Sequence, residues 1–485
     1  MQTTSSFRLV LSTLALAAFA AAQSPFTPGN LVVSRVGDGA AALSNAATAR
    51  FLDEYTPAGV LVQTIALPTV TSGSNFAFTA SGTATSEGFV SQSADGRYLI
   101  LAGYSAAAGT ASVVSTTAAA TPRVVARVAL DGTVDTSTAL TDAYSGNNIR
   151  SACSTNGTDL WTAGTASATN GPGVRYTTFG STTTTQLSTS PTNMRVVNIA
   201  LDQLYCSAAT GAFQGVSTVG TGLSTTSGQT TTLLNGFPVT SGPGAYDHYF
   251  ADSNTLYVAD DRVTVAGGIQ KWVLAAGTWT LVYTLNPAAG AGCRGISGFT
   301  EGGVTTLFAT TTSNLLVSVQ DTGIGSTFTV VATGATNTAL RDVQWVRTPS
   351  SVTYSGTSCA NSFGTPTVAI GGGLPVAGNV NFAINAGNCG PANITVFLLR
   401  FGPVLPFGVP LPGTPACALV YVAADAILPT FSDLTGAAPL PIPIPNNASI
   451  AGVELANQVA AFDFSLLGFD LPIGTSDAMS VILGN

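Results

Sequence analysis

Short runs of alternating apolar and polar residues fill most of this chain and predict β-strands, because helical periodicity is nearly absent. Gly, Asn, Asp and Pro separate these runs and mark turns. One unit recurs: a strand, a tight polar turn, and a second strand with an apolar-aromatic pair. Asp95-Gly96 and Asn156-Gly157 suit the two-residue turns that join antiparallel strands. The second strands carry leucines at Leu99, Leu160, Leu204, Leu256 and Leu307.

The spacing of these units predicts a β-propeller. Each copy is followed by a further pair of strands, and four strands per 40–50 residues is the size of a propeller blade. A solenoid is the alternative, although its repeats are shorter. The aromatic residues beside the leucines fit the core between blades better than a carbohydrate platform. They are Tyr98, Trp161, Tyr205, Tyr257 and Phe308.

The two ends of the repeat region complete one another. Residues 31–36, 50–55 and 60–67 look like the last three strands of a blade, and residues 341–346 look like a first strand without a blade behind it. Pairing these pieces closes the ring and removes an exposed edge. We therefore expect six blades, one of them a composite of both ends. Seven are possible, because the interval from 31 to 99 is long.

The remainder of the chain changes character after the repeats. We expect the propeller over 23–347, a linker over 348–357 and a small antiparallel β-sandwich over 358–485, so the fold class is all-β. The last part lacks the repeat and has proline-rich runs at 405–412 and 439–445. Such prolines keep to strand edges and turns.

The N-terminus predicts export. Arg8 precedes an apolar stretch over 9–22 that ends in small residues, which is typical of a signal peptide over 1–22 cleaved after Ala22. A membrane anchor is the alternative, although Pro25 and Pro28 follow at once. We expect no transmembrane segment after cleavage, and a secreted or cell-surface location, with the periplasm possible.

Cysteine usage agrees with export. The six cysteines contain no C-x-x-C pair, which argues against zinc ribbons and thioredoxin-type motifs. An oxidising compartment permits disulfides. Cys359 with Cys417 is the favoured bridge, and buried free cysteines are the simplest reading of the others.

Charge narrows the chemistry. Only 8% of residues are charged, the net charge is −8 and the pI is near 4.5, which argues against nucleic acid and anionic membranes. Single copies of His248 and Lys271 exclude two-histidine metal sites and a phosphate-binding P-loop. We therefore predict no metal or cofactor. Asp38 and the run Asp260-Asp261-Arg262 could bind calcium, but solvated turn acids are the simpler reading.

Charged residues recur at the starts of the predicted innermost strands, which line the central channel of a propeller. Arginine forks suit carboxylates and phosphates, so the pattern predicts an axial site for an anionic or sugar-acid ligand. The competing interpretation is a structural ring in which the arginines pair with the acids and with loop carbonyls. The residues are Glu87, Arg150, Arg195, Asp247, His248, Arg294, Arg341 and Asp342.

Catalysis would need a base or nucleophile in this set. His248 is the sole histidine, and Asp247 precedes it. Neighbours on a strand point to opposite faces, and no Gly-x-Ser-x-Gly occurs, so a serine hydrolase is a weak hypothesis. A hydrolase or lyase that uses arginines with acids is the stronger catalytic alternative.

Two parts of the chain resemble known families. Residues 29–39, 51–59 and 83–88 resemble a family of secreted bacterial propeller-like proteins without an established activity. Residues 358–362, 406–408 and 416–419 are similar to a C-terminal domain of exported planctomycete proteins. The resemblance implies an envelope or extracellular protein and carries over no catalytic residue.

The sequence thus predicts an exported, non-catalytic binding or structural protein of the cell envelope. Its propeller would recognise a ligand or partner, such as an envelope or extracellular protein or a glycan. The C-terminal domain would attach or assemble the protein. The alternatives are a hydrolase or lyase acting on a carbohydrate or lactone in the axial pocket, and a surface-layer or adhesin assembly protein.

Overall fold

The computed structural model describes residues 23–264, 266–288, 291–466 and 468–485. The predicted signal peptide, residues 1–22, lies outside them. The described residues contain strands and two 3-10 turns, η1 (Val113–Ser115) and η2 (Ala448–Ile450), and no α-helix. No helix in that part of the chain is long and apolar enough to cross a membrane.

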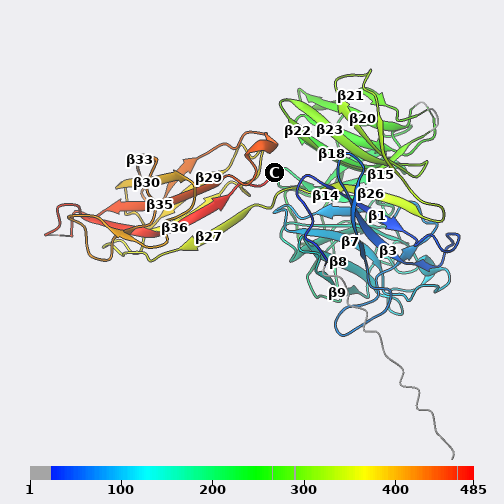
Figure 1. Cartoon of the computed structure of the whole chain (residues 1–485), viewed down its shortest axis with the longest axis horizontal. Helices are drawn as coiled ribbons and strands as arrows, with labels where there is room; N and C mark the ends of the chain where they lie inside the picture. The colour runs from blue at the N-terminus through cyan, green and yellow to red at the C-terminus, as the bar shows by residue number, and fades with distance from the viewer. Residues whose placement is uncertain (1–22, 265, 289–290, 467) are drawn as a thin grey trace, which may run out of the picture.

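Six four-stranded antiparallel sheets form a closed ring, so the protein is a six-bladed β-propeller (Figure 1). Blade 1 is the predicted composite, in which the last propeller strand pairs with the first. From the axis outward its strands are β26 (Ala339–Trp345), β1 (Leu31–Val36), β3 (Arg50–Tyr55) and β4 (Leu61–Ala66).

The other five blades follow in sequence, each with its first strand innermost. Blade 2 has β6 (Val90–Gln92), β7 (Tyr98–Tyr104), β8 (Arg123–Ala129) and β9 (Val134–Leu140). Blade 3 has β10 (Ile149–Ser154), β11 (Asp159–Gly164), β12 (Gly173–Thr178) and β13 (Thr185–Gln186). Blade 4 has β14 (Val197–Ala200), β15 (Gln203–Ala208), β16 (Gly215–Val219) and β17 (Thr231–Leu233). Blade 5 has β18 (Ala245–Asp252), β19 (Thr255–Asp260), β20 (Gly268–Ala275) and β21 (Thr278–Leu285). Blade 6 has β22 (Cys293–Glu301), β23 (Val304–Thr311), β24 (Leu315–Asp321) and β25 (Thr329–Thr333). A two-stranded sheet of β2 (Ala47–Thr48) and β5 (Ala80–Ser81) lies beside them.

The alternation of each strand builds the core between blades. On β7, Leu99 and Leu101 pack in the cluster shared with blade 1, whereas Ile100 packs with Ile149 and Leu160 of blade 3. Both faces of a blade are therefore buried. The five repeat leucines are all fully buried.

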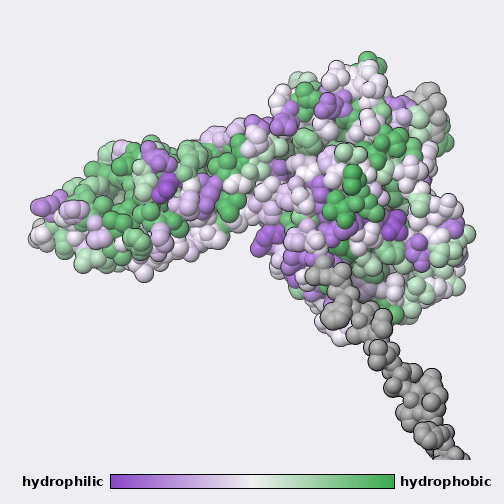
Figure 2. All heavy atoms as spheres, in the orientation of Figure 1, coloured by the Kyte–Doolittle hydropathy of each residue, from purple (hydrophilic) through white to green (hydrophobic). Residues whose placement is uncertain are grey.

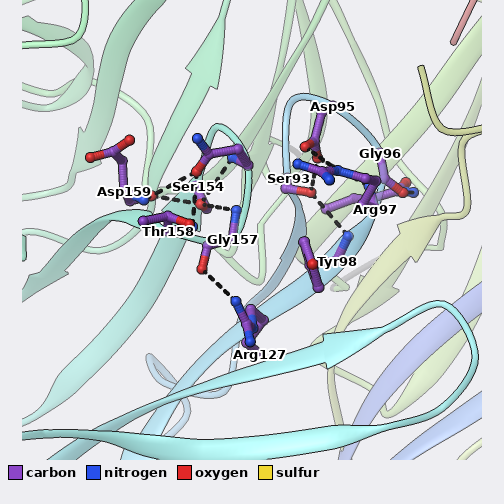
Figure 3. A network of polar contacts seen from close by, with 12 residues as sticks. Ser93, Asp95, Gly96, Arg97, Tyr98, Arg127, Ser154, Gly157, Thr158 and Asp159 are labelled. Carbon is purple, nitrogen blue, oxygen red and sulfur yellow. Dashed lines mark hydrogen bonds and ion pairs between the residues drawn. The ribbon is translucent and has the colours of Figure 1, made fainter. Parts of the chain in front are cut away.

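The repeated hairpin turn contacts the preceding blade (Figure 3). Ser154 Oγ donates to the carbonyl of Asp159 at 2.6 Å and accepts the N–H of Gly157 at 2.8 Å. Gly157 has a φ of +82°, and a Cβ there would lie 2.5 Å from the Tyr98 ring. Arg127 of blade 2 donates to the Gly157 carbonyl at 3.3 Å. The turn glycine thus serves both the backbone conformation and the packing between blades.

The C-terminal part forms the predicted sandwich of two sheets. One has the order β27 (Ser351–Ser355), β36 (Ile473–Ile482), β35 (Glu454–Phe462), β30 (Ile394–Phe401) and β33 (Ala426–Phe431). The other has β28 (Thr367–Gly371), β29 (Ala383–Gly387) and β34 (Ala438–Pro441). A short pair, β31 (Val409–Pro410) with β32 (Leu419–Val420), lies outside both.

Two details of this domain bear on the sequence predictions. The linker expected over 348–357 is wrong in extent, because Ser351–Ser355 forms β27 and pairs with β36. This strand forms by pairing with β36, which lies more than a hundred residues later in the chain. Cys359 and Cys417, the favoured pair, form a disulfide, and the other four cysteines are free and buried.

Candidate functional site

The predicted arginines lie at one end of the propeller channel, where the inner strands begin. In four blades a register shift in the pairing of the innermost strand falls at this point, and the irregular residues include Arg150, Tyr246, Arg294 and Arg341. A β-bulge takes residues out of the regular ladder and can redirect their side chains. The repeated irregularity therefore presents equivalent side chains from several blades to the same region, which we call the arginine mouth.

Tyr246 lies at the centre of this mouth. The guanidinium of Arg195 lies 3.8 Å from the centroid of the Tyr246 ring, and that of Arg294 lies 5.8 Å from it. The Phe89 ring of blade 2, on the opposite side of the propeller from blade 5, is 6.2 Å from the Tyr246 ring. Phe89, Val196 and Tyr246 form one buried cluster. These three side chains close the channel at the level of the arginines.

The arginines are only partly engaged. Arg150 Nη1 donates to Asn193 Oδ1 at 2.5 Å and to the Met194 carbonyl at 2.8 Å. Arg341 Nη2 donates to the Gly82 carbonyl at 2.7 Å. The aliphatic part of the Arg341 side chain packs on Gly88, where a Cβ would lie 2.9 Å from Arg341 Cγ. Within the described residues, Nε and Nη1 of Arg195 are buried without a hydrogen-bond partner.

Burial lowers the pKa of two of these arginines. The pKa of Arg150 falls to about 10, through burial first and the charge of Arg195 second. Burial likewise lowers the pKa of Arg341, although the charge of Glu87 partly opposes it. A pKa of about 10 leaves Arg150 charged near neutral pH. The like charges thus stay close together inside the protein.

The predicted acids do not form ion pairs with these arginines. Glu87 precedes β6 and accepts hydrogen bonds from the Ser81 N–H, the Tyr104 hydroxyl and Asn148 Nδ2. Asp247 and Asp342 accept the N–H groups of Ile296 and Val90 on the next blade. Burial raises the pKa of all three carboxyls, that of Asp247 to about 7. Arg150 and Arg341 thus donate to backbone carbonyls, as a structural ring of arginines would require. The three acids bind other groups and do not pair with the arginines.

The acid that does face the arginines is Asp261, which belongs to the acidic run considered for calcium. Asp261 Oδ2 lies 4.0 Å from Arg294 Nε. Burial raises the pKa of Asp261, while Arg195, Arg294 and a hydrogen bond from Tyr246 lower it in part. The sequence signal for Asp261 was its place directly after β19, at the same end of the blade as Arg294.

The expectation of solvated turn acids is wrong for Asp260, which is fully buried. Asp260 is buried, accepts both Nε and Nη2 of Arg262, and accepts Gln270 Nε2 at 3.0 Å. The described residues contain no group of three His, Cys, Asp or Glu side chains that could hold a metal ion.

His248 does not belong to the arginine mouth. Its ring lies edge-on to the neighbouring rings of Tyr205 and Phe250, with centroid distances of 6.5 and 6.1 Å. Neither ring nitrogen has a partner among the described residues, and burial lowers the His248 pKa to about 4. Asp247 accepts the backbone N–H of His248 and not the imidazole. Asp247 and His248 thus do not form the acid-base pair of a serine hydrolase.

Comparisons with known proteins agree with a propeller and go no further. The chain matches no known protein-family profile, and no curated protein matches its sequence. Among solved structures, a candidate 6-phosphogluconolactonase of Bacteroides fragilis has a TM-score of 0.38 at 12% identity, covering 74% of this chain and 91% of its own. The periplasmic gluconolactonase of Pseudomonas aeruginosa has a TM-score of 0.37 at 12% identity, covering 74% and 92%. The Citrobacter koseri protein AztD has a TM-score of 0.29 at 11% identity, covering 74% and 79%. At these values the chain is similar to propellers of several functions, and no ligand or activity follows for it.

Proposed function

We propose that this protein is an exported binding protein whose propeller recognises an anionic small molecule, such as a sugar acid or a phosphorylated sugar, at the arginine mouth. The observation that carries the proposal is the pair Arg195 and Arg294, both of which lie beside the Tyr246 ring. Arg195 has two buried guanidinium nitrogens without a partner among the described residues. Leaving such donors unsatisfied costs free energy, which a carboxylate or phosphate would recover.

The charge balance supports an anion. Among the described residues, one counter-charge lies within 4.0 Å of the four arginines of the mouth, that of Asp261 near Arg294. Because Asp247 and Asp342 tend to hold protons, the mouth carries an excess of positive charge. Arginine forks match the geometry of carboxylate and phosphate oxygens.

Calorimetric titration of the chain from residue 23 onward tests the proposal. The probes are gluconate, glucuronate, glucose 6-phosphate and inorganic phosphate, with neutral glucose as the negative probe. We expect binding of one or more anions, weakened at least tenfold in Arg195→Ala/Arg294→Ala. The charge-matched control is Arg97→Ala/Arg400→Ala, which removes two cations outside the mouth and should bind as the parent does. Equal loss in both variants, or no anion binding by the folded parent, would refute the proposal.

Asp261 favours one second candidate, a hydrolase or lyase acting on a lactone or sugar acid. Its raised pKa and its place beside two arginines would suit a proton donor next to a bound anion. Turnover of glucono-lactones by the parent, lost in Asp261→Asn while anion binding persists, would support this candidate. Binding without turnover supports the non-catalytic proposal.

We propose export to the envelope or the extracellular space, and attachment or assembly through the C-terminal domain. The disulfide suits an oxidising compartment. The edge strand β33 and its surroundings expose Phe401, Phe431 and Leu434, which are 75%, 72% and 84% accessible. Figure 2 shows apolar residues spread over much of the visible face of this domain, with strongly polar groups at its far end and near its middle. N-terminal sequencing of the mature protein tests export. Sedimentation of the variant Phe431→Ser/Leu434→Ser, compared with the parent, tests assembly through the C-terminal domain.

A further inference from the structure

A cavity lies along the inner strands beyond the arginine mouth and extends to the C-terminal domain. Its volume is about 550 Å³. The last residues of β14, β18, β22 and β26 form its propeller side, and residues 374 and 376–381 of the C-terminal domain form the other. In Figure 1 the C-terminus lies at this junction between the two domains. Along β22 the lining runs from Ile296 to Thr300, so it begins two residues beyond Arg294, roughly 7 Å at the strand rise of about 3.3 Å per residue.

Direct contacts hold the two domains together around the cavity. Asn446 Nδ2 donates to the Ala251 carbonyl at 2.9 Å. The N–H of Thr348 donates to Asn485 Oδ1 at 2.6 Å, and the N–H of Asn485 donates to the Thr348 carbonyl at 3.3 Å. Asp202 lies against Gly373, where a Cβ would be 2.6 Å from its carboxylate. The cavity is therefore a property of both domains together.

The charges on its wall argue against an anionic occupant. The lining includes Asp202 and Asp252, which would repel an anion. Its one guanidinium, that of Arg347, already donates to the carbonyls of Gln92 and Ser93, at 3.2 and 2.8 Å. His248 adds no charge near neutral pH, because burial lowers its pKa to about 4. This environment differs in kind from the arginine mouth.

The remaining lining combines aromatic rings with amides. Phe250, Phe299 and Trp345 border the cavity, and the rings of Phe299 and Trp345 stack with centroids 4.7 Å apart. Asn198 of the propeller and Asn381 of the C-terminal domain supply donors and acceptors from opposite sides. Sugars present apolar C–H faces to aromatic rings and hydroxyls to amides and carboxylates. The volume falls in the range of small-molecule sites, roughly 300–1,000 Å³.

We propose that this interdomain cavity is a binding site for a short neutral oligosaccharide, held between the propeller and the C-terminal domain. The site is complete only when both domains are in place. A sugar bound there contacts both and stabilises their association, because a ligand that binds one arrangement favours it by mass action. Glycan recognition thus lies at the junction, independent of anion binding at the arginine mouth.

A glycan array carrying neutral, acidic and amino sugars tests the proposal with the chain from residue 23 onward, followed by calorimetry with the retained glycan. We expect retention of a neutral glycan. Asn198→Ala/Asn381→Ala should weaken it at least tenfold, and the bulkier Ala377→Trp should abolish it by filling the cavity. Asn235→Ala, an exposed asparagine at the edge of blade 4, is the matched control and should leave binding unchanged.

The outcomes separate this site from the proposed function. Neutral-glycan binding that survives Arg195→Ala/Arg294→Ala but not the two cavity variants supports the proposal, whatever the arginine mouth binds. Retention of acidic or amino sugars alone overturns it, as does neutral-glycan binding that the cavity variants leave intact. An array on which the folded protein retains no neutral glycan overturns it as well. Circular dichroism establishes that each variant is folded.

Discussion

The carboxylate of Asp342 accepts the backbone N–H of Val90 at 2.8 Å, although the two residues are 252 positions apart. This bond joins the inner strand of the composite blade to that of blade 2. Asp247 repeats the arrangement on blade 5, where its Oδ2 accepts the N–H of Ile296 on blade 6 at 3.2 Å. Buried acceptors at one strand position thus link neighbouring blades around the axis.

The first prediction concerns this link. Asp342→Ala removes the acceptor and leaves the buried N–H of Val90 without a partner, which should cost about 1–3 kcal/mol of unfolding free energy. Asp342→Asn keeps an acceptor oxygen and should cost less, since the high pKa of Asp342 already favours its neutral form. Urea unfolding measures both variants. Equal destabilisation by Asn and Ala would show that the negative charge matters more than the bond.

A second prediction follows from the neighbour of Asp342. A Cβ built on Gly295 would lie 1.9 Å from Asp342 Oδ1 and 2.6 Å from its Cα, so Gly295→Ala should destabilise the propeller by about 1–3 kcal/mol or more. Combining it with Asp342→Ala removes one side of the clash. In a double-mutant cycle we expect the pair to cost less than the sum of the single changes. Strict additivity would contradict the contact.

The pKa of Asp247 gives a third prediction. Burial raises this pKa from 3.8 to about 7, so the folded protein keeps a proton that the unfolded chain releases over that window. The stability that this protonated group contributes is present below about pH 4 and is lost as pH rises through 7. Asp247→Asn removes the titration. The unfolding free energy of the parent, measured relative to this variant, should therefore fall between pH 4 and pH 7.

The comparison cancels the groups whose titration does not depend on Asp247; the pKa of Asp342, which the charge of Asp247 raises, changes with the substitution. His248, whose lowered pKa acts in the opposite direction between about pH 4 and 6.5, is present in both proteins. A difference that stays constant across this range would contradict the assignment of the proton to Asp247.

The fold was predictable because its evidence is local and repeated. Each copy carries its own leucine, its own turn and its own alternation. The five repeat leucines, from Leu99 in blade 2 to Leu307 in blade 6, are all core residues. The composite blade followed from two incomplete ends, at Leu31 and Trp345, that the structure pairs directly. The linker failed because β27 owes its strand to β36, and pairing over that distance leaves no local signal.

The arginines were found for the same reason, since a repeated position reveals itself by alignment. Tyr246 was missed because it replaces arginine at the equivalent place in blade 5. Asp261 reaches the mouth from a loop whose path the sequence does not define. The interdomain cavity depends on how the C-terminal domain docks, and contacts such as Asn446 with Ala251 involve residues that look like ordinary turns. The local pattern of the sequence does not predict contacts between segments that are distant in the chain, and the candidate sites depend on such contacts.

The disulfide carries the last prediction. Cys359 and Cys417 are separated by 58 residues, and a loop of that length corresponds to about 4 kcal/mol of unfolded-chain entropy. Cys359 also pairs with Thr475 of β36, so the bridge ties the start of the sandwich to its main sheet. Reduction should lower the unfolding temperature of the C-terminal domain. It should leave the propeller transition in place, because Cys153, Cys206 and Cys293 are free. Calorimetry with and without reductant measures both transitions, and Cys359→Ser/Cys417→Ser, insensitive to reductant, is the control.

Thiol titration of the denatured, unreduced chain should count four of the six cysteines. A count of two or fewer would place a further disulfide in the protein, whereas six would remove the bridge.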